Sequence, residues 1–144
     1  MARFFVMVFV VISMIFVLMI GAKAANAEVF ITIDKSEQRM YVETPMDSFV
    51  WKVSTARGGY VTPTGSFQPY LLKTMHYSRK YDNAPMPNSI FFHGGYAIHA
   101  TYDVKRLGRP ASHGCVRLSP QNAKWLFRLV SEFGKENTFI EIVE

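Results

Sequence analysis

Cysteine is nearly absent from the 144-residue sequence, which contains only one. A single cysteine cannot form an internal disulfide, and this excludes the small secreted domains that are held together by paired cysteines. One thiolate is also too few for a cysteine-rich zinc site, and the four histidines show no H-x-x-x-H spacing. We therefore predict no bound metal and no cofactor.

A strong charge of either sign is also missing. The 16 basic and 11 acidic residues give a formal net charge of +5. Residues 28–144 alone carry about +3, which is too mild to indicate a nucleic-acid-binding protein. A mild positive charge suits a polyanionic wall or a membrane surface instead. The sequence has no internal repeats, and its length allows one domain with a real core but not two.

One long hydrophobic run stands near the N-terminus. Arg3 precedes the apolar segment Phe4–Ile20, and Ala25-Asn26-Ala27 forms a cleavage site of the A-x-A type. We predict a signal peptide over residues 1–27, a single domain over residues 28–144 and delivery to the periplasm. An uncleaved membrane anchor is the alternative, because the apolar run is nearly long enough to span a bilayer.

Alternation of apolar and polar residues predicts a mainly β protein. The predicted strands are residues 29–34, 39–43, 49–54, 66–72, 89–92, 96–99 and 138–143. The first three have short links and should form an antiparallel meander, whereas Pro69 restricts the fourth to a sheet edge. Residues 75–88 show no clear period, and we predict an ordered surface loop there, of the kind that forms lids or binding loops.

One substantial helix is predicted, over residues 119–133. Ser119 is a good N-cap, Pro120 suits the first helical position, and Gly134 follows the last turn. Helical spacing predicts that one apolar stripe of this helix faces the core. The stripe consists of Ala123, Leu126, Phe127, Val130 and Phe133, with Trp125 at its flank.

The cysteine lies in the stretch Pro110–Arg117, whose small residues are typical of a tight bend. The residues around Cys115 are Ser112, His113, Gly114 and Arg117. Cations, imidazoles and backbone N–H groups lower the pKa of a thiol and so favour the nucleophilic thiolate. Gly114 also lacks the Cβ that would keep the backbone away from a substrate carbonyl. We predict a catalytic nucleophile, with a buried core cysteine as the alternative.

A thiol nucleophile needs an imidazole within hydrogen-bond reach. We assign this role to His99, which ends a predicted strand and is joined to Cys115 by a segment with a glycine and a proline that can fold back. His113 lies only two residues before the thiol, so it should be held beside the thiol and shape the site rather than accept its proton.

Two further groups near the thiol are candidates for binding charge. The backbone N–H groups of Gly114 and Cys115 could stabilise an oxyanion. The planar guanidinium of Arg117 suits a substrate carboxylate, and a structural ion pair is an equally good interpretation of this residue.

The segment Ala97-Ile98-His99, followed by Ser112-His113-Gly114-Cys115-Val116-Arg117, resembles the signature of the bacterial L,D-transpeptidase catalytic domain. Upstream segments that look like the same family are residues 54–55, 62–65, 84–87 and 92–96. The likeness spans about residues 29–143. It implies a small β-sandwich of mixed and antiparallel strands with a catalytic cysteine at the mouth of a cleft.

The resemblance also assigns roles to residues. The expected catalytic residues are Cys115, His99, His113 and Gly114, and the expected substrate-binding residues are Arg117, Ser112, Tyr96 and His93. Two positions depart from the family pattern, because Ala100 replaces a frequent Gly and Arg117 replaces an Asn found in some members. In the family, the backbone carbonyl at the first of these positions can be the third member of the triad, so a different side chain there need not harm it.

The activity implied by the resemblance is that of a periplasmic cysteine acyltransferase. The cysteine attacks the carbonyl of the third residue of a peptidoglycan tetrapeptide stem and releases D-alanine, and the acyl group then passes to an amine of another stem, remodelling the cell wall. A hydrolase, or an enzyme that attaches an outer-membrane protein to the wall, would use the same residues. A non-catalytic wall-binding module is a further alternative, disfavoured because both Cys115 and His99 are present. We expect a monomer that binds stem peptides.

Overall fold

The computed structural model describes residues 27–144, and the predicted signal peptide lies, except for Ala27, outside the described residues. The β-strands are β1 (Val29–Asp34), β2 (Arg39–Glu43), β3 (Ser48–Lys52), β4 (Gly65–Phe67), β5 (Leu71–Ser78), β6 (Ala84–His93), β7 (Tyr96–Ala100), β8 (Val116–Leu118) and β9 (Thr138–Val143). The helices are η1 (Val104–Arg106), α2 (Pro120–Phe133) and η2 (Lys135–Asn137). Within this part of the chain, no helix is both long and apolar enough to cross a membrane.

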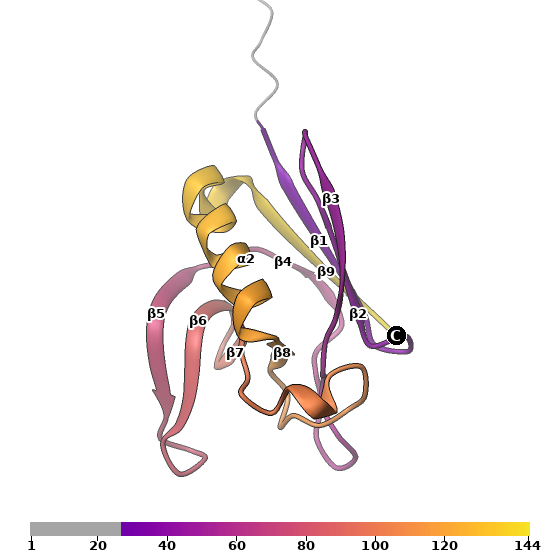
Figure 1. The fold of residues 1–144 in the computed structure, drawn as a ribbon, viewed down its shortest axis with the longest axis vertical. Coiled ribbons are helices and arrows are strands. Elements are labelled where there is room, and N and C mark those ends of the chain that lie inside the picture. The colour runs from indigo at the N-terminus through magenta and orange to yellow at the C-terminus, as the bar shows by residue number, and fades with distance from the viewer. Residues whose placement is uncertain (1–26) are drawn as a thin grey trace, which may run out of the picture.

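Two mixed sheets enclose the core (Figure 1). The first has the strand order β3-β2-β1-β9-β4, and the second has the order β5-β6-β7-β8. In each sheet one pair is parallel, β1 with β9 and β7 with β8, and the other pairs are antiparallel. Most buried side chains of both sheets and of α2 form one hydrophobic cluster, and Met86, Phe91 and Ala97 of the second sheet form a smaller one. The predicted mainly β sandwich with one α-helix is confirmed.

The ends of α2 follow from its local sequence. The Ser119 hydroxyl accepts a hydrogen bond from the Asn122 N–H, Pro120 occupies the first turn, and the Gly134 N–H closes the last turn on the Val130 carbonyl. The buried residues are Ala123, Leu126, Leu129 and Val130. Leu129 was not part of the predicted stripe, whereas Phe127 and Phe133 are only partly buried.

The prediction of one strand over residues 66–72 is wrong. β4 ends at Phe67 and lies at the edge of the first sheet, and β5 begins at Leu71 and lies at the edge of the second. Pro69 lies between them and cannot donate a ladder hydrogen bond. The chain therefore changes sheets at this proline.

The prediction of a surface loop over residues 75–88 is also wrong, because this segment forms most of a β-hairpin between β5 and β6. Its turn, residues 79–83, has Asp82 and Asn83 at φ 50° and 53°, a left-handed conformation that short polar side chains tolerate. Pro85 and Pro87 are two residues apart in β6, so the positions of their missing N–H groups lie on the same edge of the strand. Within the described chain, β7 does not pair with that part of β6, so the prolines interrupt no ladder on that edge.

Candidate active site

Parallel pairing of β7 with β8 brings the two sequence-distant halves of the site together. His99 is opposite Arg117 in the ladder, and Cys115 immediately precedes β8. Because side chains alternate along a strand, Ile98 and Val116 point into the core, while His99 and Arg117 share the opposite face. The segment between His99 and Cys115 folds back as the sequence predicted.

That face opens into a cavity of about 880 Å³. Its walls come from the β5–β6 hairpin, from the loop over residues 101–106 and from the stretch around the cysteine. Six of the predicted site residues line it, namely Cys115, His99, His113, Arg117, Ser112 and Tyr96. His93 and Gly114 are not among the lining residues, and the His93 ring packs on Phe67 and stacks with Tyr96 instead.

His99 is held in one orientation and one tautomer. The residue is 6% exposed, and Nδ1 lies 2.7 Å from the carbonyl oxygen of Ala100. Since a carbonyl only accepts, Nδ1 carries the proton and Nε2 is the free acceptor of the ring. Burial lowers the pKa of His99 to about 4, against the opposing effect of the Ala100 hydrogen bond. The imidazole is therefore neutral near pH 7 and able to accept a proton.

The Cys115 thiol is also neutral. It is half-buried, and burial raises the pKa of the thiol, although the Ala97 backbone and the charge of Arg117 oppose this effect. Sγ lies 3.8 Å from the Gly95 carbonyl oxygen, to which the thiol donates a weak hydrogen bond. The sequence-based expectation of a lowered thiol pKa is therefore wrong, because desolvation outweighs the nearby cation.

The bend before Cys115 is fixed by two hydroxyl groups. Ser112 Oγ accepts from the Gly114 N–H at 3.0 Å and donates to the Cys115 carbonyl at 2.6 Å. Thr62 Oγ1 donates to the Gly114 carbonyl at 2.7 Å and accepts from the Ala56 N–H. The Gly114 N–H is therefore already bonded, which leaves the Cys115 N–H as the stronger candidate of the two predicted oxyanion donors.

Gly114 is required for a reason that the sequence did not reveal. Its φ is 139°, and a Cβ at this position would lie 2.6 Å from a Tyr96 ring carbon and 2.9 Å from the Val61 carbonyl oxygen. Packing by Tyr96 and Val61, rather than the approach of a substrate, thus excludes a side chain here.

Arg117 lines the cavity and has no carboxylate partner among residues 27–144. Its Nη1 donates a long hydrogen bond of 3.4 Å to the Ala111 carbonyl, and burial lowers the pKa of its guanidinium. The nearby Asp103 pairs with Arg106 instead. The described residues thus provide no structural ion pair for Arg117, and its guanidinium can bind an anion in the cavity.

His113 contacts three aromatic or basic side chains rather than the thiol. Arg57 Nη2 lies 3.1 Å from Nε2, and because a guanidinium only donates, Nε2 is an occupied acceptor and His113 is neutral. Tyr81 stacks on the imidazole with a centroid distance of 4.0 Å and an interplanar angle of 8°, and Tyr60 contacts it edge-on. Burial and the charges of Arg57, Arg117 and Lys80 lower the pKa of His113.

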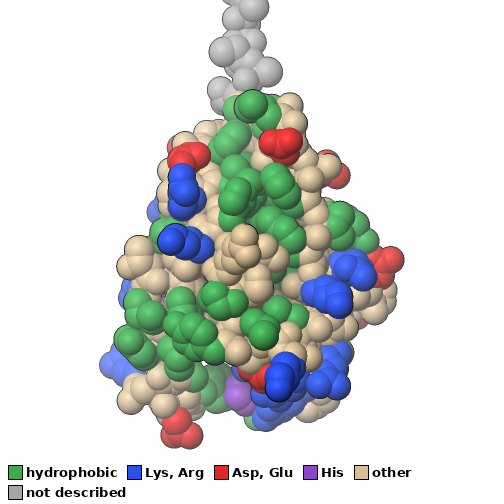
Figure 2. All heavy atoms as spheres, viewed as in Figure 1, with side chains coloured by type: hydrophobic (Ala, Val, Ile, Leu, Met, Phe, Trp, Pro, Cys, Tyr) green, Lys and Arg blue, Asp and Glu red, His purple; other side chains and the backbone are tan. Residues whose placement is uncertain are grey.

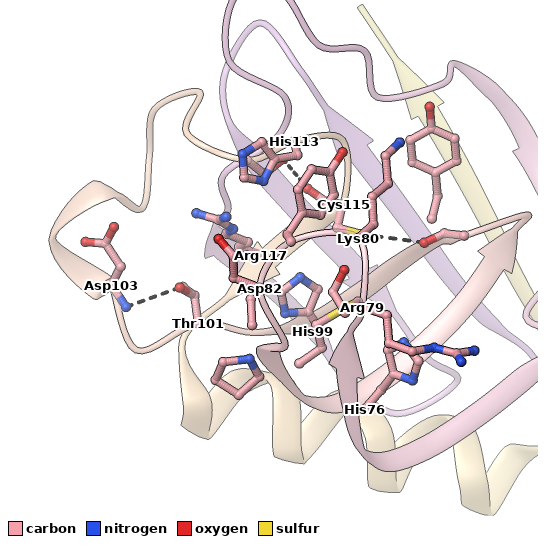
Figure 3. A pocket seen from close by; sticks show the side chains of 18 of the residues that line it. His76, Arg79, Lys80, Asp82, His99, Thr101, Asp103, His113, Cys115 and Arg117 are labelled. Carbon is pink, nitrogen blue, oxygen red and sulfur yellow. Dashed lines mark hydrogen bonds between the residues drawn. The ribbon is translucent and has the colours of Figure 1, made fainter.

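Basic side chains dominate the cavity. Arg79, Lys80 and Arg117 line it together with the Arg106–Asp103 pair and Asp82. Figure 3 shows Cys115, His99 and Arg117 at its centre, with Asp103 on one side and His76 and Arg79 on the other. Figure 2 shows Lys and Arg side chains gathered at the end of the molecule where η1 lies. The described residues contain no cluster of three or more potential metal ligands.

Sequence reasoning missed Tyr81, Arg57 and Thr62 as parts of this site. Thr62 fell within a segment that resembled the family, but its buried hydroxyl gave no signal of its own. Tyr81 lay in the segment that the sequence predicted to be a lid or binding loop. That prediction was the available signal that this segment belongs to the site. Its contact with His113 depends on the hairpin, which the sequence did not reveal.

Residues 28–142 match the protein family described as YkuD, L,D-transpeptidase catalytic domain. Among solved structures, an L,D-transpeptidase from Mycobacterium smegmatis superposes with a TM-score of 0.71 at 21% identity, over 82% of this chain and 59% of that one. L,D-transpeptidase 3 from Mycobacterium tuberculosis, solved with a faropenem-derived adduct, gives 0.70 at 18% identity, over 82% and 61% of the two chains.

A third structure, an L,D-transpeptidase from Stackebrandtia nassauensis, gives a TM-score of 0.66 at 24% identity, over 81% of this chain and 56% of that one. The chain thus spans about three fifths of the length of these solved structures. No match was found among curated proteins.

Proposed function

The chain belongs to the L,D-transpeptidase catalytic domain family, and from this premise we propose that it is a cysteine acyltransferase acting on the stem peptides of peptidoglycan. Cys115 attacks the carbonyl of the third residue of a tetrapeptide stem. The amide bond to D-alanine breaks, and a thioester to Cys115 forms. The amine of a second stem then attacks this thioester, which yields a new amide and restores the thiol.

His99 carries the proton in both halves of this reaction. In the resting site both partners are neutral, so His99 Nε2 accepts the thiol proton as Sγ attacks, rather than holding a preformed ion pair. The resulting imidazolium protonates the departing D-alanine amine. Neutral again, it takes a proton from the incoming amine and passes it to the departing Cys115 thiolate. The Ala100 carbonyl keeps Nδ1 protonated throughout.

The thiol must turn before it can react. It rests 3.8 Å from the Gly95 carbonyl, and a bound substrate that displaces it from this contact brings Sγ toward Nε2 of His99. Catalytic hydrogen bonds often tighten only when substrate is bound. The Cys115 N–H then faces the developing oxyanion, and Ser112 and Thr62 hold the backbone of the bend.

Arg117 binds a carboxylate of the donor stem. It lines the same cavity as Cys115, carries an unpaired guanidinium among the described residues, and is joined by Arg79 and Lys80 in giving the cavity a positive charge. Tyr96 packs against Gly114 and Ser112 bonds the bend, so both shape the subsite. His93 does not line the cavity, so we propose no direct role for it in substrate binding.

One observation carries the proposal. The sole cysteine and a buried histidine with a free Nε2 line one cavity on adjoining parallel strands. The test is to incubate the purified protein with a tetrapeptide stem, alone and with an amine-bearing second stem, and to identify the products by mass spectrometry. A cross-linked product with release of D-alanine supports the acyltransferase. A tripeptide alone indicates the hydrolase, and unaltered stems indicate a binding module.

We further propose that the domain works in the periplasm, after cleavage of the leader following Ala27, and that it acts as a monomer. The basis for the cleavage and the location is the A-x-A sequence before Glu28. N-terminal sequencing of protein from envelope fractions should find Glu28 as the first residue. An intact N-terminus in the membrane fraction would favour the anchor instead.

A further inference from the structure

Gln38 is a buried polar residue that the reaction described above does not use. It ends the turn between β1 and β2, is only 3% exposed and has φ 53°, in the left-handed region. A long side chain seldom adopts this conformation, which Gly, Asn and Asp tolerate better. Residues held in such conformations tend to lie near functional sites, so the contacts of Gln38 are informative.

The side-chain amide of Gln38 is fully engaged. Its Oε1 accepts from the Thr55 N–H at 2.9 Å, while Nε2 donates to Thr55 Oγ1 at 2.6 Å and to the Lys35 carbonyl at 2.7 Å. A backbone N–H only donates and a carbonyl only accepts, so these partners fix the orientation of the amide. Gln38 thus holds Thr55 by both its main chain and its side chain.

This side chain extends a ladder that the backbone does not continue. The pairing of β2 with β3 ends at Arg39 and Lys52, and one further backbone bond joins the Val53 N–H to the Gln38 carbonyl. The chain then turns back to β1. The Thr55 N–H, two residues further along, bonds the Gln38 amide instead of a backbone carbonyl.

Thr55 carries the contact on to the bend that holds the candidate nucleophile. Its carbonyl accepts from the N–H groups of both Ala111 and Ser112, at 3.0 and 2.9 Å. Ser112 Oγ in turn donates to the Cys115 carbonyl at 2.6 Å. A line of hydrogen bonds therefore runs from the buried amide of Gln38 through Thr55 to the backbone of Cys115.

We propose that Gln38 is a positioning residue, which fixes Thr55 and thereby sets the direction of the Cys115 N–H, the candidate oxyanion donor. Gln38 does not line the cavity and touches no reacting atom. An oxyanion donor acts only when it is placed accurately, and a displacement of about 1 Å can slow a reaction by about 10²-fold. The effect on the rate of acylation rests on the proposed function, whereas the effect on the bend does not.

The effect on the bend can be measured by amide hydrogen exchange, followed by NMR. In Gln38→Ala the shared acceptor of Ala111 and Ser112 is no longer fixed, so their amides should exchange faster by about 10-fold or more, relative to the amides of α2. Gln38→Asn separates the side chain from the backbone, because Asn tolerates a positive φ but is one methylene shorter and should not reach Thr55. It should behave as Gln38→Ala does.

Thr138→Val is the matched control. Thr138 is also fully buried, and its Oγ1 donates to the Gly134 carbonyl at 2.9 Å, but it begins β9 and does not line the cavity. The substitution removes one buried hydrogen bond without touching the bend. The exchange of Ala111 and Ser112 relative to α2 should therefore stay as in the parent protein.

The effect on catalysis is measured by comparing two reactions of Cys115. With faropenem, Sγ adds to the β-lactam carbonyl through an oxyanion and the ring C–N bond then breaks, whereas alkylation by iodoacetamide forms no oxyanion. Both Gln38 variants should slow acylation by about 10- to 100-fold and change alkylation far less. A residue that only adds stability would leave the ratio of the two rates unchanged.

Parent-like exchange of Ala111 and Ser112 in either folded Gln38 variant would overturn the proposal, as would an equal acceleration in Thr138→Val. Faster exchange with an unchanged ratio of acylation to alkylation would overturn the role in catalysis. If the parent protein is not acylated at all, the proposed function fails, and the exchange rates still decide whether Gln38 fixes the bend. The two proposals therefore fail separately.

Discussion

The Nδ1–H of His99 donates to the carbonyl oxygen of Ala100, the next residue in the chain, at 2.7 Å. The third member of the candidate triad is thus a backbone atom, so the identity of the side chain at position 100 does not remove it. Burial keeps the imidazole neutral and burial also keeps the Cys115 thiol protonated. The site at rest is a neutral thiol beside a neutral base, and its pH behaviour follows from that.

The rate of alkylation of Cys115 should follow the pH dependence of a thiol whose pKa is raised above its ordinary value. Only the thiolate reacts with iodoacetamide, and burial favours the protonated form. The rate should therefore increase steadily from pH 6 through pH 9, without a plateau near neutral pH. A rate that is already maximal at pH 6 to 7 would show a preformed thiolate–imidazolium pair and contradict the neutral resting state.

His99 and His113 should respond differently to substitution. His99→Gln removes the proton acceptor and should slow acylation of Cys115 by about 10²–10⁴-fold. His113→Phe keeps the ring that stacks with Tyr81 and removes a nitrogen that Arg57 already occupies, so acylation should slow by less than about 10-fold. The rates of adduct formation, measured by mass spectrometry, test this difference between the two histidines. A larger loss in His113→Phe than in His99→Gln would reverse the two roles.

Stability should fall as the pH is lowered from about 6.5 to 4. The pKa of His99 is about 4 in the folded protein and 6.5 ordinarily, so in this window the unfolded chain binds a proton that the folded chain does not. Stability from this group is fully present above pH 6.5 and is lost toward pH 4, by about 3 kcal/mol in all. Denaturant unfolding at several pH values measures this loss of unfolding free energy.

The matched control for this effect is His99→Gln, which has no titrating group at this position. Its unfolding free energy should change less between pH 6.5 and 4 than that of the parent protein. His76 and His113 also have lowered pKa values through burial, so part of the decline should remain. Equal declines in both proteins would show that His99 is not buried as a neutral base.

Gly114→Ala should destabilise the protein and slow acylation. The positive φ and the two close contacts, with Tyr96 and the Val61 carbonyl, force a shift of the bend that carries Cys115. We expect a loss of about 1–3 kcal/mol in unfolding free energy. Gly58→Ala is the control, since a Cβ there meets nothing within 4 Å. Similar effects of the two substitutions would contradict the packing argument.

Local signals were sufficient to predict several elements of this fold. The meander over β1, β2 and β3 followed from strict alternation, and the ends of α2 followed from Ser119, Pro120 and Gly134. The fold-back that joins His99 to Cys115 was predicted as well. In each case the determining residues are neighbours in the sequence, so the pattern can be interpreted without knowledge of the tertiary structure.

The parts of the fold and of the site that the sequence did not predict depend on contacts between segments far apart in the chain. The hairpin tolerates Pro85 and Pro87 because, among residues 27–144, no strand pairs with one edge of β6 near its tip, and sequence alone does not show which edge a strand leaves unpaired. The direction of the thiol pKa shift depends on how deeply Cys115 is buried. Arg57 and Tyr81 meet at His113 from segments far from it in the chain.

The central claim is that Cys115 is the acyl-accepting nucleophile, and covalent capture of a β-lactam tests it most directly. One structural relative carries a faropenem-derived adduct, so the purified protein is incubated with faropenem or a carbapenem and analysed by intact-mass and peptide mass spectrometry. We predict one adduct per chain, on the peptide that contains Cys115. Cys115→Ser should show no adduct but melt at the parent's temperature, because a hydroxyl ionises far less than a thiol. An adduct on the serine variant or on another residue, or none on the folded parent protein, would contradict the account.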